Sequence, residues 1–190
     1  MSKWLPVLLL ACAGVGAHAA PSSDVSQDDL GRFMAHRGLV GQIQQAGHQV
    51  ADRTGQLLST AMELIGVPYR RGGTSEETGF DCSGFVRTIY QKAVGLTLPR
   101  LSAEQAAATE KIQKQDLQPG DLVFFNTMRR AFSHVGIYVG EGKFIHAPRT
   151  GAKVRIESME SSYWANRFNG ARRVETEEAS SITAALRPQG

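Results

Sequence analysis

Three side chains that are far apart in the sequence, those of Cys82, His134 and His146, could together carry out nucleophilic chemistry. A thiolate attacks a carbonyl carbon readily, but a free cysteine with a pKa near ~8.5 is mostly protonated at neutral pH. A neighbouring imidazole can take the thiol proton, and a second polar group can fix the tautomer and angle of that imidazole. These residue types therefore predict a cysteine nucleophile served by a base and by a group that orients the base.

Cys82 stands where a glycine-rich loop runs into an apolar stretch. The stretch predicts a helix because apolar residues recur three and four positions apart, at Phe85, Val86, Ile89, Tyr90 and Ala93. Asp81 is the expected N-cap, which places Cys82 in the first turn, where free N–H groups and the helix dipole lower a thiol pKa. A buried cysteine that only packs is the alternative. The small residues Gly79, Ser83 and Gly84 leave the sulfur little cover and favour the reactive interpretation.

The two histidines are expected on adjacent strands of one hairpin. His134 begins one apolar run and His146 ends the next, with residues 140–142 as the turn between them. A three-residue loop places Gly136 opposite His146, so that His134 and His146 are diagonal neighbours on one face. A two-residue loop would shift the register by one and put them on opposite faces. A catalytic pair therefore predicts a loop of odd length.

Metal binding and nucleic-acid binding are two other classes of function to weigh. Cys82, Asp81, His134 and His146 could gather round a zinc ion, but no CxxC or HxxxH pair anchors such a site, so neither a metal nor a cofactor is expected. The formal net charge of +3 is small and dispersed, which argues against a nucleic-acid partner. The arginine pairs at 70–71 and 129–130 are expected to be solvated loop charge.

The elements that must position these residues change in period along the chain. Helical patterns come first, over 56–65, from Cys82 to near Gly95, and in a short segment opened by a capping-box pattern at 102–105. Five short apolar runs follow and predict strands at 122–125, 135–139, 143–146, 154–157 and 170–174. Helices followed by strands predict an α+β domain, in which N-terminal helices pack on one face of an antiparallel sheet of about five strands.

The N-terminus has the pattern of a secretory signal. A short positive start precedes an apolar run over 4–15 and an Ala-x-Ala site at 17–19. We expect cleavage after Ala19 and secretion across the inner membrane into the periplasm, because the run is too short to span a bilayer permanently. The alternative is a lipobox at 9–12, in which Cys12 would carry a lipid anchor. If cleavage removes Cys12, Cys82 is the single cysteine and cannot form an internal disulfide.

The rest of the chain suits one globular domain with extra segments. A length of 190 residues with 42% hydrophobic content leaves room for a real core. The expected layout is a signal peptide over 1–19, a flexible leader with a short helix over 20–52, a catalytic domain over 53–174 and a polar tail over 175–190.

The motifs, taken in order, also match a known family. They are Gly66–Tyr69, Gly72–Gly73, Phe80–Phe85, Leu98–Arg100, Leu117–Phe125, Ser133–Tyr138 and Phe144–Ala147. The segment from Gln56 to Val174 resembles the NlpC/p60 cysteine peptidases. The resemblance implies a papain-like α+β fold and a secreted hydrolase that acts on the peptide stems of bacterial peptidoglycan.

The resemblance also implies a role for individual residues. Cys82 matches the family's nucleophile, His134 its base, and His146 the polar residue that orients the base. Tyr69 matches a tyrosine that shapes the substrate cleft and assists the oxyanion. Positions that contact the substrate near the scissile bond in some members correspond to Asp81 and Ser83.

Several functions stay open at this point. A compact domain behind a Gram-negative-looking signal resembles murein endopeptidases, which favours cleavage of the D-alanyl–diaminopimelate cross-link. The alternatives are cleavage of the γ-D-glutamyl–diaminopimelate bond, a non-catalytic wall-binding module, and a thiol acyltransferase that passes the thioester to an amine. We expect a monomer whose partner is the peptidoglycan stem peptide, with a regulatory or activating protein as a further candidate.

Overall fold

The computed structural model describes residues 39–175. The chain divides into two compact units, Met1–Val40 and Gly41–Gly190. Of the first unit only the last two residues, the start of a helix, are described. The predicted signal peptide, its cleavage site, the lipobox at Cys12, the short helix of the leader and residues 176–190 of the predicted tail lie outside the described residues.

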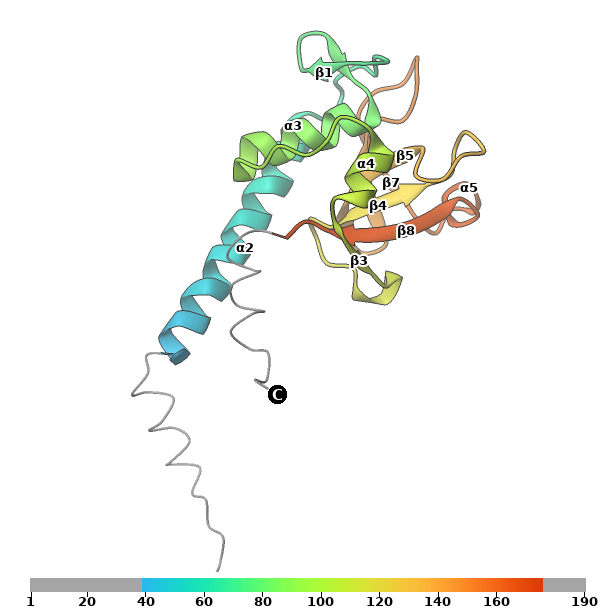
Figure 1. Cartoon of the computed structure of the whole chain (residues 1–190). Helices are drawn as coiled ribbons and strands as arrows, with labels where there is room; N and C mark the ends of the chain where they lie inside the picture. The colour runs from blue at the N-terminus through green and yellow to red at the C-terminus, as the bar shows by residue number, and fades with distance from the viewer. Residues whose placement is uncertain (1–38, 176–190) are drawn as a thin grey trace, which may run out of the picture. The chain divides into compact units, whose positions relative to one another are not determined.

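The described elements alternate less than in an α/β protein, because most helices precede most strands (Figure 1). In chain order they are α2 (Leu39–Glu63), β1 (Thr74–Ser75), β2 (Gly79–Phe80), α3 (Cys82–Val94), α4 (Ser102–Ala107), β3 (Glu110–Ile112), a 3₁₀ turn η1 (Lys114–Asp116), β4 (Leu122–Phe125), β5 (His134–Gly140), β6 (Lys143–His146), β7 (Arg155–Ser158), α5 (Ser162–Ala165) and β8 (Phe168–Arg173).

A six-stranded antiparallel sheet forms the centre of the domain, in the order β3-β8-β4-β5-β6-β7. Strands β1 and β2 pair separately, just before α3. The predicted α+β fold is confirmed, and so are the five predicted strands, within a residue or two at their ends. The sheet gains β3, an edge strand of three mostly exposed residues that was too short and polar to give an apolar signal.

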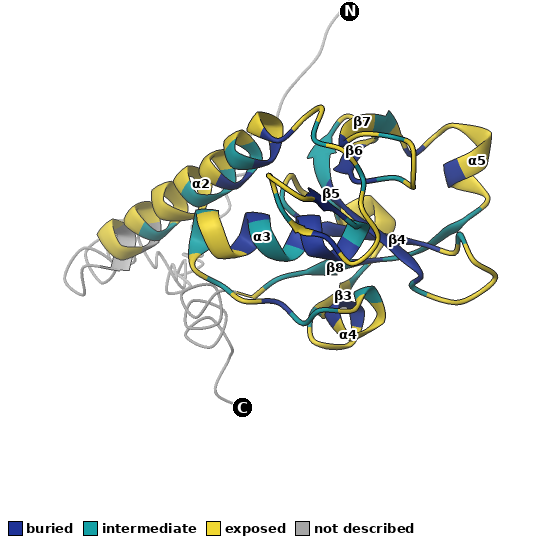
Figure 2. Cartoon of the chain, turned by 90° about the horizontal axis from the view of Figure 1, so that it is seen from above, coloured by how far each residue is buried: buried dark blue, intermediate teal, exposed yellow. Residues whose placement is uncertain are grey.

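Both faces of the sheet are covered, as Figure 2 indicates by the dark blue of the central strands. Leu122 and Phe124 of β4 pack into a core that includes residues of α2 and α3. Val123 and Phe125, which alternate with them, pack on the opposite face against Trp164 of α5. Two buried faces explain why β4 is a continuous apolar run and not an alternating one.

Helix α2 is longer than the helix expected over 56–65 and includes residues 39–52 of the predicted leader. The difference has a physical reason: only the C-terminal part of α2 contributes to the core, through Leu57 and Ala61, and the preceding turns are mostly exposed. The exposed N-terminal turns of α2 have no periodic apolar residues, so the sequence pattern predicted only the C-terminal part of the helix. No helix within residues 39–175 has the length and apolar content needed to cross a bilayer.

The turn between β5 and β6 is shorter than predicted, but His134 and His146 still lie together on one face of the sheet. The loop has two residues, Glu141 and Gly142, both with positive φ (52° and 68°), as a type I′ hairpin turn requires. An extra residue in β5, between Tyr138 and Gly140, forms a β-bulge and shifts the register by one. The expectation of a three-residue loop was therefore wrong, because the bulge supplies the odd residue that the loop lacks.

The cap of α4 also lies one residue earlier than expected. Leu101 is the N-cap, and its backbone N–H donates to the Glu104 side chain at 3.2 Å. The Ser102 hydroxyl, expected to cap the helix, donates instead to the Phe132 carbonyl at 2.6 Å. That bond ties α4 to the segment leading into β5.

Candidate active site

Cys82 occupies the first position of α3, as predicted. The preceding residue, Asp81, has extended backbone angles (φ −90°, ψ 176°), and its Oδ1 accepts the Gly84 N–H at 2.8 Å. This confirms Asp81 as the N-cap. The side chain of Cys82 is partly exposed, and α3 packs against β5, so the thiol lies where the helix start meets the strand that carries His134.

The pKa of the Cys82 thiol shifts in the opposite direction from the one expected for a cysteine at a helix start. Desolvation raises the pKa of Cys82 above its ordinary value, and the negative charge of Asp81 raises it further. Backbone N–H groups, first that of Val135, then those of Ser83 and Cys82, lower the pKa as the helix position predicted, but their effect is smaller. At neutral pH Cys82 is therefore a thiol, which would need a base to act as a nucleophile.

The two histidines expected to act as base and as orienting residue are in direct contact. His134 Nε2 and His146 Nδ1 lie 2.7 Å apart, with the two rings nearly perpendicular at 89°. His134 is 3% exposed and His146 is fully buried. Burial lowers the pKa of both imidazoles from 6.5, and for His134 the neighbouring His146 lowers the pKa further. The pair is therefore neutral at pH 7, and His134 keeps Nδ1 as its second ring nitrogen.

An aromatic wall encloses the histidine pair. The Trp164 ring stacks on His134, with 5.3 Å between ring centroids and 25° between planes, and meets His146 edge-on at 5.1 Å. Phe125 and Phe144 pack round the same ring. Phe125, Phe144 and Trp164 lie on the face of the sheet opposite the one on which α3 packs. Sequence reasoning missed Trp164 because the short α5 that carries it gave no periodic pattern.

Glu157 is the second residue that sequence reasoning missed. Its Oε2 lies 2.8 Å from His146 Nε2 and accepts the Trp164 Nε1–H at 3.0 Å, while its Oε1 accepts from Arg155 Nη2 at 2.9 Å. His146 pairs with Arg155 across β6 and β7, so Glu157 is the diagonal neighbour of His146. The diagonal rule that joined the two histidines could have found Glu157, had the loop over 147–154 fixed the register of β7.

Asp81 and Ser83, the predicted substrate contacts, belong to a network with Arg100. The Arg100 guanidinium donates to both oxygens of Asp81, at 3.0 Å and 2.5 Å, and to Ser83 Oγ at 3.0 Å. Asp81 Oδ2 also accepts the Gly72 N–H at 2.9 Å. The network joins the glycine-rich loop, the helix start and the segment before α4 beside Cys82.

Tyr69 lies on the loop side of the same site. Its backbone N–H donates to the Ala152 carbonyl at 2.8 Å, and its partly buried side chain packs against the core, as does that of Cys82. Burial raises the pKa of Tyr69, and negative charge at Cys82 and Asp81 raises it further. The phenol therefore keeps its proton and is a hydrogen-bond donor near the thiol.

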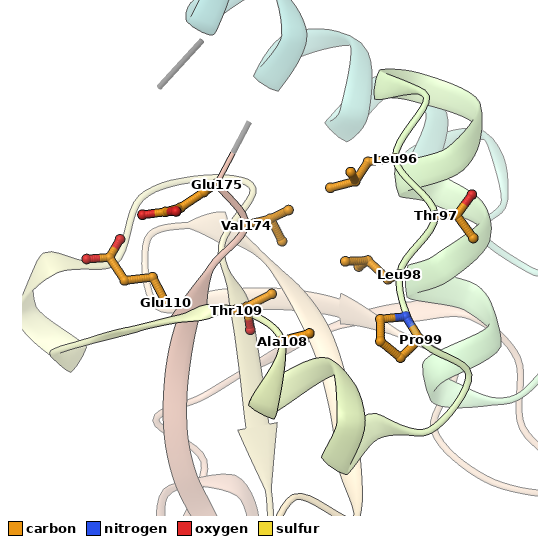
Figure 3. Close-up of a pocket in the computed structure, with 9 residues that line it drawn as sticks. All are labelled: Leu96, Thr97, Leu98, Pro99, Ala108, Thr109, Glu110, Val174 and Glu175. Atoms are coloured by element: carbon orange, nitrogen blue, oxygen red, sulfur yellow. The ribbon is translucent and has the colours of Figure 1, made fainter. Parts of the chain in front are cut away.

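A separate hollow lies where the loop after α3 passes the end of β8 (Figure 3). None of the six predicted site residues lines it. Its walls are Leu96, Thr97, Leu98, Pro99, Ala108, Thr109, Glu110, Val174 and Glu175. Apart from two carboxylates at the rim the lining has no ionisable side chain, and it contains neither a cysteine nor a histidine. Within residues 39–175 no three metal-ligating side chains are grouped to hold an ion.

A cysteine at a helix start, an antiparallel sheet and a buried histidine pair beside them define a papain-like α+β domain. The chain belongs to the NlpC/P60 family, whose sequence profile matches residues 66–173. The match spans all the residues of the candidate site, from Tyr69 to Trp164.

Two curated relatives illustrate the range of the family. The chain is 44% identical over 131 residues to the Escherichia coli (strain K12) protein named Murein DD-endopeptidase MepH, covering 67% of this chain and 48% of that protein. It is 44% identical over 118 residues to the Bacillus subtilis (strain 168) protein named Gamma-DL-glutamyl hydrolase, covering 62% of this chain and 28% of that protein. The chain thus spans less than half the length of either relative.

Solved structures agree with this assignment. An NlpC/P60 family protein from Bacillus cereus superposes with a TM-score of 0.59 at 39% identity, covering 63% of this chain and 39% of that one. The NlpC/p60 domain of peptidoglycan hydrolase SagA superposes with a TM-score of 0.57 at 32% identity, covering 64% of this chain and 98% of that domain.

Proposed function

We propose that this protein is a cysteine-type peptidoglycan endopeptidase, with Cys82 as nucleophile, His134 as base and His146 as the residue that orients the base. The observation that carries the proposal is the 2.7 Å contact of two buried, neutral imidazoles, His134 at the start of β5 and His146 at the end of β6. Helix α3 packs against β5, and the backbone N–H of Val135, next to His134, donates to Cys82. Burying two adjacent histidines is costly, and a module that only binds the wall has no need of them.

The mechanism follows from the protonation states. His134 Nδ1 takes the proton from Cys82 as the sulfur attacks an amide carbonyl and forms the C–S bond. The Cys82 backbone N–H and the Tyr69 hydroxyl donate to the developing oxyanion. The imidazolium then protonates the amine as the C–N bond breaks, which leaves a thioacyl enzyme. Water, deprotonated by His134, cleaves the thioester and restores the thiol.

The cross-link between D-alanine and diaminopimelate is the favoured bond. Relatives named murein DD-endopeptidases support this choice, among them MepH and the E. coli (strain K12) protein named Murein DD-endopeptidase MepS/Murein LD-carboxypeptidase, 44% identical over 123 residues. The relative named Gamma-DL-glutamyl hydrolase supports the γ-D-glutamyl–diaminopimelate bond as the alternative. In either case Asp81 and Ser83 are proposed to contact the stem peptide near the scissile bond.

The proposal includes the layout of the chain and its compartment. A peptidoglycan substrate lies outside the cytoplasmic membrane, which supports export by the signal peptide at 1–19 and action in the periplasm. The leader is then 20–52, the catalytic domain 53–174 and the tail 175–190. Intact mass analysis of the protein exported by a Gram-negative host tests this layout: a chain beginning at Ala20 supports it, and a lipidated Cys12 would replace it by the anchored form.

Digestion of purified cross-linked muropeptides tests the activity. The mature protein and its Cys82→Ala variant are incubated with dimers under reducing conditions, and the products are weighed by mass spectrometry. Conversion of dimers to monomers by the wild type alone supports cross-link cleavage, and shortened monomer stems move the cut to the γ-D-glutamyl bond. Equal products from both proteins, or none from either, contradict the proposal.

A further inference from the structure

The hydrogen bonds that begin at the base end at a carboxylate. From His134 Nε2 the line passes to His146 Nδ1 at 2.7 Å and from His146 Nε2 to Glu157 Oε2 at 2.8 Å. His146 is fully buried, so water does not compete for either of its ring nitrogens. The protonation of the whole line is therefore set by the group at its far end.

Glu157 is ionised, because the hydrogen bond from His146 and the nearby Arg155 hold its pKa far below the ordinary value, at about 2. An ionised carboxylate can only accept hydrogen bonds. His146 must then carry its proton on Nε2, which leaves Nδ1 as an acceptor. His134 must in turn carry its proton on Nε2 to donate to His146, so its Nδ1 is bare and free to take a proton.

The opposite arrangement would disable the base. If His146 carried its proton on Nδ1, it would donate to His134 Nε2, and the neutral His134 would then hold its proton on Nδ1. A protonated Nδ1 cannot accept the proton of Cys82. Only one of the two tautomer sets of this pair therefore supports general-base catalysis, and a carboxylate at His146 Nε2 selects it.

We propose that Glu157 is a positioning residue for the reaction, fixing the tautomers of both imidazoles so that His134 presents a bare Nδ1 to Cys82. The consequence for rate rests on the proposed function, whereas the tautomers themselves do not. The negative charge of Glu157 also stabilises the imidazolium that forms when His134 takes the thiol proton.

Further contacts hold the Glu157 side chain in place. The Trp164 indole donates to the same oxygen as His146, and Trp164 also stacks on His134, so one side chain holds both ends of the line. Arg155, 46% exposed, binds the other carboxylate oxygen. His146 from β6 and Arg155 from β7 are the ionisable groups bonded to Glu157 within residues 39–175.

The test is Glu157→Gln, with Glu141→Gln as the matched control. Glutamine keeps the shape of the side chain, but its neutral carbonyl accepts more weakly, and its amide can rotate to donate to His146 Nε2 and impose the wrong tautomers. Glu141 is exposed in the β5–β6 turn and bonds only to Lys143 among the described residues. Nitrogen-15 NMR of the imidazoles reads the tautomers without substrate, and kcat and KM are measured on cross-linked muropeptides.

We expect protonated Nε2 and bare Nδ1 on both rings in the wild type and in Glu141→Gln. In Glu157→Gln we expect protonated Nδ1 to appear and kcat to fall by about 100-fold with KM nearly unchanged, less than the roughly 10⁴-fold cost of a wrong tautomer at a base bonded directly to its carboxylate. Protonated Nδ1 on His146 of the wild type overturns the inference, as does a Glu157→Gln kcat within twofold of the control.

Two further measurements separate the role of the Glu157 charge from an effect on folding. Glu157→Asp retains the charge and is expected to recover part of the lost kcat, and a kcat equal to that of Glu157→Gln would overturn the role of charge. If Glu157→Gln does not fold, as judged by circular dichroism, the wild-type spectrum alone decides. A wild type that shows the expected tautomers but no Cys82-dependent hydrolysis would refute the proposed function and leave the assignment of tautomers intact.

Discussion

Two carboxylates flank the candidate active site, Asp81 on the helix side and Glu157 on the sheet side, and they differ in what binds them. Asp81 accepts from the guanidinium of Arg100 and from backbone N–H groups of the loop and the helix. Glu157 accepts from the imidazole of His146 and the indole of Trp164, with Arg155 on its outer oxygen.

These different hydrogen-bond partners indicate two different roles for the carboxylates of Asp81 and Glu157. The bonds of Asp81 connect backbone segments, so its removal should first cost stability. The bonds of Glu157 end at the ring that contacts His134, the proposed base, so the removal of Glu157 should first lower the rate. Chemical type alone does not distinguish the two roles, whereas the hydrogen-bond partners do.

The largest expected effect comes from breaking the sheet-side line at its centre. His146→Phe keeps an aromatic ring, slightly larger than the imidazole, among Phe144 and Trp164 but gives His134 Nε2 no acceptor. We expect kcat to fall by about 10³- to 10⁴-fold, as for loss of the orienting group in a catalytic triad. Steady-state kinetics on muropeptides measures the loss. A variant that folds and keeps a tenth of the activity would show that His146 does not orient the base.

The helix side should respond in stability. Asp81→Ala removes the N-cap and the partner of Arg100, and an N-cap alone contributes about 1 kcal/mol. Because the ion pair is only partly exposed, we expect a total loss of about 1–3 kcal/mol in the free energy of unfolding. Urea unfolding of the Cys82→Ala background, with and without Asp81→Ala, measures it. No change in the midpoint would mean that the network does not hold the helix start.

Acid should weaken the sheet side. The pKa values of His134 and His146 in the folded protein lie below 6.5. Below pH 6.5 the unfolded chain therefore binds protons that the folded chain does not, and the free energy of unfolding decreases as the pH is lowered. Glu157 adds a second loss between pH 4.5 and about 2, because its folded pKa is depressed. Thermal melts from pH 7 to 4 should show a decline that His146→Phe makes shallower. An equal slope in both proteins would contradict this account.

The smallest effect concerns the thiol. Asp81→Asn keeps a side-chain oxygen for the helix cap but removes the charge that raises the pKa of Cys82. We expect the pH midpoint of Cys82 alkylation by iodoacetamide to fall, and the rate at pH 8 to rise by about two- to fivefold. Glu141→Gln is again the control. A midpoint that stays or rises would show that Asp81 does not act on the thiol through its charge.

Local patterns predicted the helix side better than the sheet side. The cap at Asp81 and the helix from Cys82 follow from neighbouring residues, and both are confirmed. The contact between His134 and His146 was also predicted, although the register that produces it comes from a bulge in β5 and not from a three-residue loop. Glu157 and Trp164 depend on how a loop and a short helix return to the sheet, which no local pattern fixes.

The desolvation of the partly exposed Cys82 thiol was equally invisible in the sequence. Small neighbours suggested an exposed, acidic thiol, but the packing of α3 on β5 desolvates it and reverses the sign of the pKa shift. The base then becomes a requirement of the chemistry and not an aid to it.

The proposed mechanism requires a thioester between Cys82 and the stem peptide. Wild-type protein is mixed with cross-linked muropeptide, quenched in acid within milliseconds, digested and weighed. We predict that the peptide containing Cys82 carries the acyl part of the substrate in a bond that hydroxylamine cleaves. Product formation with no acyl group on Cys82, or turnover that persists in Cys82→Ala, would contradict the account.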